Sequence, residues 1–243
     1  MRRSYYDTEK IYEQPSTEKL QGNASETVMK AKKKGKLYHP VTVKGRTIAK
    51  SWWGKAWCEN LERYADYESR LDRGKRYLRT GTVVDLQIDK GHVTAKVQGR
   101  RKTPYNVDVR ISPINEAECQ RIMSYCGKKI ESLDVLLKGT FPEEYKEIFL
   151  GENGLFPTPR EISFNCSCPD WAILCKHVSA VLYGIAVRFD EDPLLFFTLR
   201  GIDVDHFVDV TLENSVESML KNINAESDRI ITQDGWEELF GLA

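Results

Sequence analysis

The chain has 243 residues, 41% of them hydrophobic and 30% charged, and its 36 lysines and arginines balance 36 aspartates and glutamates. This composition excludes a disordered or collagen-like protein and allows one large domain or two smaller ones. No apolar run approaches the roughly 18 residues of a membrane span, and the polar start carries no export signal, so we expect a cytoplasmic protein with reduced thiols.

The zero net charge hides an uneven distribution along the sequence. Residues 28–110 hold 21 lysines and arginines against 8 acidic residues, whereas residues 111–243 hold 11 against 23. A basic half is typical of proteins that bind the nucleic-acid backbone, because each neutralised phosphate releases a counterion. The alternative is that the two halves attract each other, within one molecule or between copies.

The chain begins with residues 1–38, which are polar, end in a run of lysines and show no sustained hydrophobic period. This pattern predicts a polar and basic tail or arm. Residues 39–112 hold the first periodic apolar patterns, and they predict a basic α+β domain that contains an antiparallel meander.

The first helix of that domain is expected to begin after Ser51, which can cap it. Trp53, Trp57 and Leu61 recur at helical spacing and predict one buried face, since tryptophan buries a large apolar area. Trp52 lies off this stripe and close to lysines in the sequence. Among these tryptophans it is the candidate to test for stacking on bases.

Three runs alternate apolar and polar residues with a period of two: residues 82–88, 92–98 and 105–111. Such runs joined by short turns predict an antiparallel meander with one buried face. The link between the second and third runs carries three adjacent cations: Arg100, Arg101 and Lys102. Both a solvated turn and a phosphate contact remain open for this link.

Residues 113–158 predict a helical connector, with Ser112 as its N-cap and Pro113 at the first helical position. Residues 203–243 predict an acidic helical C-terminal segment, and the pattern leaves open whether it packs internally. Three further cysteines are expected to be small core residues without a metal: Cys58, Cys119 and Cys126.

Four residues of metal-binding type lie close together in the segment 159–202: Cys166, Cys168, Cys175 and His177. Three thiolates and a neutral imidazole form a complete tetrahedral ligand set for Zn²⁺, which leaves no position for a catalytic water. A short strand before the first cysteine and an apolar helical period after the third predict a strand, a turn and a helix clamped by structural zinc.

Three other interpretations of this motif remain. Cys175 and His177 could form a nucleophile and its base, but they diverge at a helix start and no orienting group is indicated. An iron-sulfur cluster prefers four cysteines. The third interpretation is a set of buried cysteines that bind no metal, although three thiols and an imidazole rarely lie so close together without a metal ion.

The spacing Cys-x-Cys, six residues, Cys-x-His, followed by an apolar helix, resembles the SWIM zinc finger. Residues 48–58, 96–107 and 192–201 also resemble stretches of bacterial SWIM zinc finger family proteins. The resemblance implies two short strands and a helix around zinc, in a module of SWI/SNF-type helicase-like ATPases and Mutator-type transposases. It also implies a role in binding DNA or protein partners, often as the companion of such an ATPase.

The patterns together predict an α+β protein: an N-terminal antiparallel β-meander with helices, followed by a mainly helical part that carries a ββα-like SWIM zinc finger. The chain lacks the glycine-rich loop with Lys-Ser or Lys-Thr that cradles nucleotide phosphates. Any ATPase must therefore be a separate polypeptide.

We expect a zinc-binding, non-enzymatic accessory protein that binds DNA, or another nucleic acid, and a helicase-like ATPase, in the cytoplasm and near the nucleoid. The expected phosphate contacts are Lys32, Lys33, Lys34, Arg73, Lys75, Arg76, Arg100, Arg101 and Lys102. The alternative is a pure protein adaptor without nucleic-acid contact. A nuclease that uses Asp85 and Asp108 has less support, because strand residues often include such carboxylates.

Overall fold

The computed structural model describes residues 15–66, 68–127, 143–151 and 154–203, with single positions between 206 and 220. Residues 1–14 of the expected tail and most of the expected C-terminal segment 203–243 lie outside the described residues. The elements are α1 (Thr17–Lys33), α2 (Trp52–Glu62), α3 (Glu68–Arg79), β1 (Val83–Asp89), β2 (His92–Val97), β3 (Tyr105–Ile111), α4 (Glu116–Gly127), the 3-10 turn η1 (Glu143–Tyr145), α6 (Lys146–Leu150), β4 (Ile162–Cys166), α7 (Lys176–Glu191) and α8 (Leu195–Leu199).

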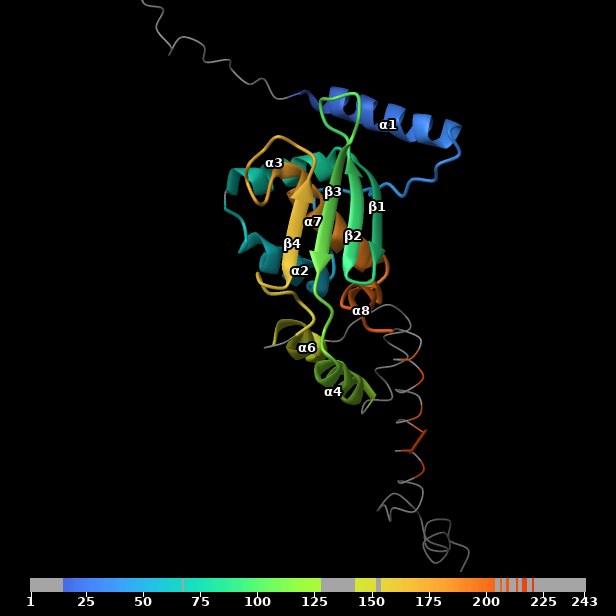
Figure 1. Cartoon of the computed structure of the whole chain (residues 1–243), viewed down its shortest axis with the longest axis vertical. Coiled ribbons are helices and arrows are strands. Elements are labelled where there is room, and N and C mark those ends of the chain that lie inside the picture. The colour runs from blue at the N-terminus through green and yellow to red at the C-terminus, as the bar shows by residue number, and fades with distance from the viewer. Residues whose placement is uncertain are drawn as a thin grey trace, which may run out of the picture.

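The fold is α+β, and its centre is a four-stranded antiparallel sheet in the order β1-β2-β3-β4. The predicted three-strand meander is confirmed within one residue at each end. Helices α2, α3 and α7 lie behind one face of the sheet, and the other face is open (Figure 1). None of the described helices combines the length and the apolar character that crossing a membrane requires.

The zinc-finger segment is built into this sheet. Strand β4 pairs with β3 from Ile111↔Ile162 to Val107↔Cys166, so residues far apart in sequence share one core. The resemblance implied two short strands within the finger, and this expectation is wrong. Within 159–202 the structure has one strand, β4, and its partner is β3 of the meander. Beyond β4 the backbone bends, because Cys168 must turn toward the other thiols and Pro169 has no N–H to donate.

The prediction of a polar arm over residues 1–38 is also wrong for its described part, because residues 17–33 form helix α1. Leu20, Ala24 and Ala31 are buried at helical spacing, and Ser16 caps the helix by accepting from the Lys19 amide. This apolar face is narrow and made mostly of alanine, so its period is weak in the sequence. The buried face packs the helix against β1 of the sheet.

Helix α7 is the centre of the core, because twelve of its 16 residues are buried. It packs against α2, α3 and the sheet. Gly74 of α3 allows the closest approach, since a Cβ at this position would lie 2.1 Å from the Ser179 hydroxyl of α7. Ser51 caps α2 as predicted, and Trp57 lies in the core.

Trp52 does not form the free stacking platform expected from the sequence. Its ring makes edge contacts with Trp53 and Phe149, at 5.7 Å and 5.4 Å between centroids, and the Lys146 ammonium lies over it. The sequence could not predict this packing, because Phe149 belongs to α6, almost a hundred residues further along the chain.

The start of α4 also differs from the prediction. Ser112 continues the pairing of β3 by donating its amide to the Glu161 carbonyl at 2.8 Å, so it does not cap a helix. The helix begins at Glu116, and the Asn115 side chain accepts from the Glu118 amide at 2.9 Å. The backbone hydrogen bond to the neighbouring strand therefore takes precedence over the local capping signal.

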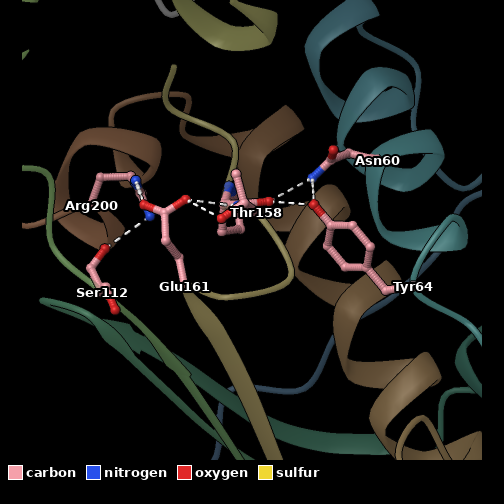
Figure 2. Close-up of polar contacts among 7 residues, drawn as sticks. Asn60, Tyr64, Ser112, Thr158, Glu161 and Arg200 are labelled. Atoms are coloured by element: carbon pink, nitrogen blue, oxygen red, sulfur yellow. Dashed lines mark hydrogen bonds and ion pairs between the residues drawn. The ribbon is translucent and has the colours of Figure 1, made fainter. Parts of the chain in front are cut away.

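A polar clamp holds the start of β4 to α8 and α2 (Figure 2). The buried guanidinium of Arg200 donates to the Ser112 carbonyl at 2.8 Å and pairs with Glu161, which also accepts from the amide and hydroxyl of Thr158. Partial burial acts to raise the pKa of Glu161, but the hydrogen bonds from Arg200 and Thr158 outweigh it and lower that pKa. Asn60 of α2 donates to the Pro157 carbonyl.

We expect the Arg200→Ala substitution to lower the free energy of unfolding by about 2–4 kcal/mol, because Arg200 is 3% exposed and its loss removes the side-chain donor to the Ser112 carbonyl and the cation that pairs with Glu161. Urea unfolding measures the loss. The control is Arg110→Ala, since the Arg110 side chain is 73% exposed and its surface ion pair contributes about 0–1 kcal/mol. Equal effects of the two substitutions would contradict the clamp.

Candidate metal centre

The four predicted ligands come together where a strand ends and a helix begins. Cys166 is the last residue of β4, and Cys168 follows in the turn. Cys175 is the N-cap of α7 and His177 lies in its first turn. One ligand atom from each of these residues lies within 4.8 Å of all the others.

The separations fit a tetrahedral zinc ion. With Zn–S near 2.3 Å and Zn–N near 2.0 Å, tetrahedral angles require roughly 3.5 Å between sulfur and nitrogen and roughly 3.8 Å between sulfurs. The Cys166 Sγ and the His177 Nδ1 are 3.8 Å apart. Three sulfurs and one nitrogen are also the donors that zinc prefers in sites filled entirely by protein.

The protonation tendencies of the cluster agree with metal binding. A hydrogen bond with Cys175, together with burial, raises the pKa of the Cys166 thiol, and the same bond lowers the pKa of Cys175 to about 4. Burial lowers the pKa of His177, so its imidazole is neutral and has a lone pair to donate. Three sulfurs packed this closely need a cation before all of them can ionise together.

The His177 ring is held between two tyrosines. Tyr105 of β3 stacks on it at 4.1 Å with an interplanar angle of 24°, and Tyr77 of α3 meets it edge-on at 5.4 Å. On Tyr105 in turn lies the guanidinium of Arg101, 5.3 Å from the ring centroid. The metal centre is therefore in direct packing contact with the basic loop at residues 99–104.

Gly99 is needed for this packing. A Cβ on Gly99 would lie 2.8 Å from the Tyr105 ring, so a larger residue would push the loop away from that ring, while the 3.6 Å to the His177 Nε2 is an ordinary contact. Gln98 closes the loop by donating to the carbonyls of Gly99 and Arg101.

The loop between the second and third cysteines is tied to α3 and to the chain before it. Asp170 forms an ion pair with Arg70 at 3.2 Å, and the Ile173 amide donates to the Asp66 carboxylate at 3.1 Å. Trp171 and Ile173 nevertheless face solvent, with 77% and 72% of their surface exposed. The sequence analysis did not predict this exposed pair. The signal that could have indicated it is the presence of two large apolar residues at i and i+2 between two metal ligands.

The predicted phosphate contacts fall into two groups in the structure. Two of them have internal partners, since Lys75 pairs with Glu62 at 2.8 Å and Arg76 donates to the Pro15 carbonyl. The other seven form no ion pair with any described residue: Lys32, Lys33, Lys34, Arg73, Arg100, Arg101 and Lys102. Their roles in binding remain predictions.

The two carboxylates considered for a nuclease line a depression of about 480 Å³ on the open face of the sheet. Asp85 is buried and accepts from the His39 amide at 3.0 Å, while Asp108 pairs with His92 and Arg110. Both carboxylates are therefore engaged with neighbouring side chains and backbone.

Comparison with known proteins agrees with this geometry. Residues 164–183, from the end of β4 through the first half of α7, match the family model of the SWIM zinc finger. The chain contains a SWIM zinc finger. Its Cys166, Cys168, Cys175 and His177 cluster is the zinc site of that finger.

The chain is also similar to a protein of Mycobacterium tuberculosis, the uncharacterized protein Rv2102, which is 39% identical over 156 residues. The match covers 63% of this chain and 56% of the relative, so the chain spans little more than half the length of the protein it resembles. No solved structure matches the chain.

Proposed function

We propose that this SWIM-finger protein is a non-enzymatic accessory protein that binds the nucleic-acid backbone with its basic end and a helicase-like ATPase with its acidic half. The observation that carries the proposal is that cations without an ion-pair partner among the described residues come from separate parts of the chain and lie at one end of the sheet. They come from the end of α1, from the loop 99–104 and from α3.

Hydrogen bonds join these parts of the chain. Asn23 and Thr27 of α1 donate to the Gly99 carbonyl and to the Gln98 side chain, at 3.3 Å and 2.7 Å, so the helix lies against the basic loop. On the other side, Arg76 of α3 reaches the Pro15 carbonyl just before α1. In Figure 1 the helix, the loop and α3 lie at the same end of the sheet.

Cations that form no ion pair with any described residue favour an external anion. Neutralising several phosphates at once releases counterions, which supports weak, sequence-tolerant binding with Kd on the order of 10⁻⁴ to 10⁻⁶ M at physiological salt. Zinc holds the loop through the stack of His177, Tyr105 and Arg101, so it fixes the relative positions of these charges.

The test is fluorescence anisotropy of labelled DNA titrated with the full chain at several salt concentrations. We expect the affinity to fall as salt rises, and the triple variant Arg100→Glu, Arg101→Glu, Lys102→Glu to weaken binding by about 10-fold or more at low salt. The control carries charge reversals of the same size at Lys90, Arg110 and Arg160, which are exposed and lie at the other end of the sheet, where β1 and β3 end and β4 begins. Absent or salt-independent binding by the unmodified protein would overturn the proposal.

A pure protein adaptor is the second candidate, and one observation favours it. The basic and acidic halves already attract each other, because Arg70 pairs with Asp170 and Asp190 accepts from the amides of Lys50 and Ser51. In this case the triple charge reversal would reduce stability or partner binding and leave DNA retention unchanged.

A further inference from the structure

We propose that the loop carrying Trp171 and Ile173 is a stacking platform for unpaired bases, which makes single-stranded nucleic acid the ligand of the basic end. This inference rests on the proposed backbone binding and adds a specificity to it. The ligand is recognised by two groups: the π-face of a base and the phosphates on either side of it.

The exposure of Trp171 is unusual for this fold. Trp53 and Trp57 are buried in the core, and Trp52 packs against Trp53 and Phe149. Trp171 instead keeps most of its surface in solvent, next to the equally exposed Ile173. An exposed tryptophan beside an aliphatic residue offers a flat apolar surface that a base can cover.

The platform is rigid before any ligand arrives. Zinc ligands flank the loop on both sides, at Cys168 and Cys175, and the side chain of Leu174 is fully buried. The ion pair of Asp170 with Arg70 ties the loop to α3. A surface that is already ordered loses little conformational entropy when it binds, so more of the stacking energy appears as affinity.

Cations lie on the elements around the finger. On α3, Arg70 binds Asp170 and Tyr77 contacts His177, so both face the finger. Arg73 lies three residues after Arg70 and four before Tyr77, and this helical spacing places it on the same face. Arg101 lies on the opposite side of His177, above Tyr105. Lys176 follows the third cysteine directly.

The carboxylates near the loop are already engaged. Asp170 pairs with Arg70 and accepts weakly from the Ala172 amide, and Asp66 accepts from the Ile173 amide. Arg73, Arg101 and Lys176 form no ion pair with any described residue, so each can contact a phosphate. This charge pattern favours a nucleic acid over an acidic or purely apolar protein segment as the partner.

Only an unpaired base can lie flat on Trp171, because the bases of a duplex are stacked on each other and their faces are covered. Stacking on an aromatic side chain is sensitive to alanine substitution and tolerant of sequence. We therefore expect Trp171→Ala to weaken single-strand binding by about 5- to 100-fold and to leave duplex binding within about twofold.

The experiment compares a labelled oligothymidylate with a duplex of the same length at low salt, using the full chain with its zinc. The variants are Trp171→Ala, Trp171→Phe, which keeps an aromatic face, and Ile173→Ser. Trp171→Phe should retain single-strand binding within about threefold. Zinc content and melting temperature are measured for each variant, and the exposure of both residues predicts that neither changes.

The outcomes separate this inference from the proposed function. If the unmodified protein binds both nucleic acids and Trp171→Ala weakens neither, or weakens both equally, the stacking platform is wrong and backbone binding stands. Loss of a co-purifying protein with unchanged single-strand binding would make the loop a protein-docking site instead. If the unmodified protein binds neither nucleic acid at low salt, the proposed function fails first.

Discussion

Replacing Cys175 by serine is expected to reduce bound zinc from about one equivalent to well below half and to unfold the finger with much of the core. Apparent binding energies for structural zinc are roughly 10–16 kcal/mol in small fingers, which matches or exceeds the roughly 5–15 kcal/mol that stabilises a whole domain. Cys175 is buried and caps α7, the helix against which α2, α3 and the sheet pack. Losing the ligand therefore affects more than the finger.

Circular dichroism during thermal unfolding, with zinc content measured on the same samples, tests this prediction. The matched control is Cys119→Ser, the same substitution at a half-buried cysteine of α4 outside the cluster. It should keep its zinc and most of its stability. A Cys175→Ser protein that binds a full equivalent of zinc and melts like the unmodified chain would contradict the assignment.

Trp57→Ala is expected to lower the free energy of unfolding by about 3–5 kcal/mol. Trp57 is 1% exposed, donates its indole N–H to the Leu182 carbonyl at 3.0 Å, and makes edge contacts with Phe189 and Phe196 at 5.1 Å and 5.9 Å. Removing it leaves a cavity between α2, α7 and α8, and the Leu182 carbonyl keeps only its helical partner.

Trp171→Ala provides the comparison, because it removes the same side chain from a position that is mostly in solvent. Urea unfolding should show a loss of less than about 0.5 kcal/mol for this variant. Comparable losses at the two positions would mean that the aromatic cluster around Trp57 does not form the core described for the protein.

The sequence predicts those elements whose signals are local. Period-two alternation places β1, β2 and β3, and helical spacing after Cys175 places α7. Ser51 is correctly predicted as the cap of α2, because capping depends on residues within one turn. The ligand set of the finger also follows from spacing alone, since few structures other than a metal site bring three thiols and an imidazole together.

Local sequence patterns do not predict features that depend on contacts between distant residues. The apolar face of α1 consists of Leu20 and two alanines, too little for a clear period until the end of the sheet covers it. The pairing of β4 with β3 joins segments about fifty residues apart, so no local signal in the sequence indicates that the strand of the finger pairs with a strand of the meander. The stack of Tyr105 on His177 has the same origin.

The zinc centre thus connects parts of the chain that the sequence presents as separate. Through Cys166 it fixes the end of the sheet, through Cys175 the start of the central helix, and through His177 and Tyr105 the basic loop. In the proposed function, removal of zinc by a chelator should therefore weaken the proposed DNA binding as well as stability. Charge alone, without this geometry, would leave the loop free to move.

The most direct test of the central claim is zinc K-edge X-ray absorption of the purified full chain. The account predicts one zinc per molecule with three sulfur ligands near 2.3 Å and one nitrogen ligand at roughly 2.0–2.1 Å. A spectrum dominated by oxygen ligands, or a preparation that holds less than about half an equivalent of zinc when purified without chelators, would contradict it.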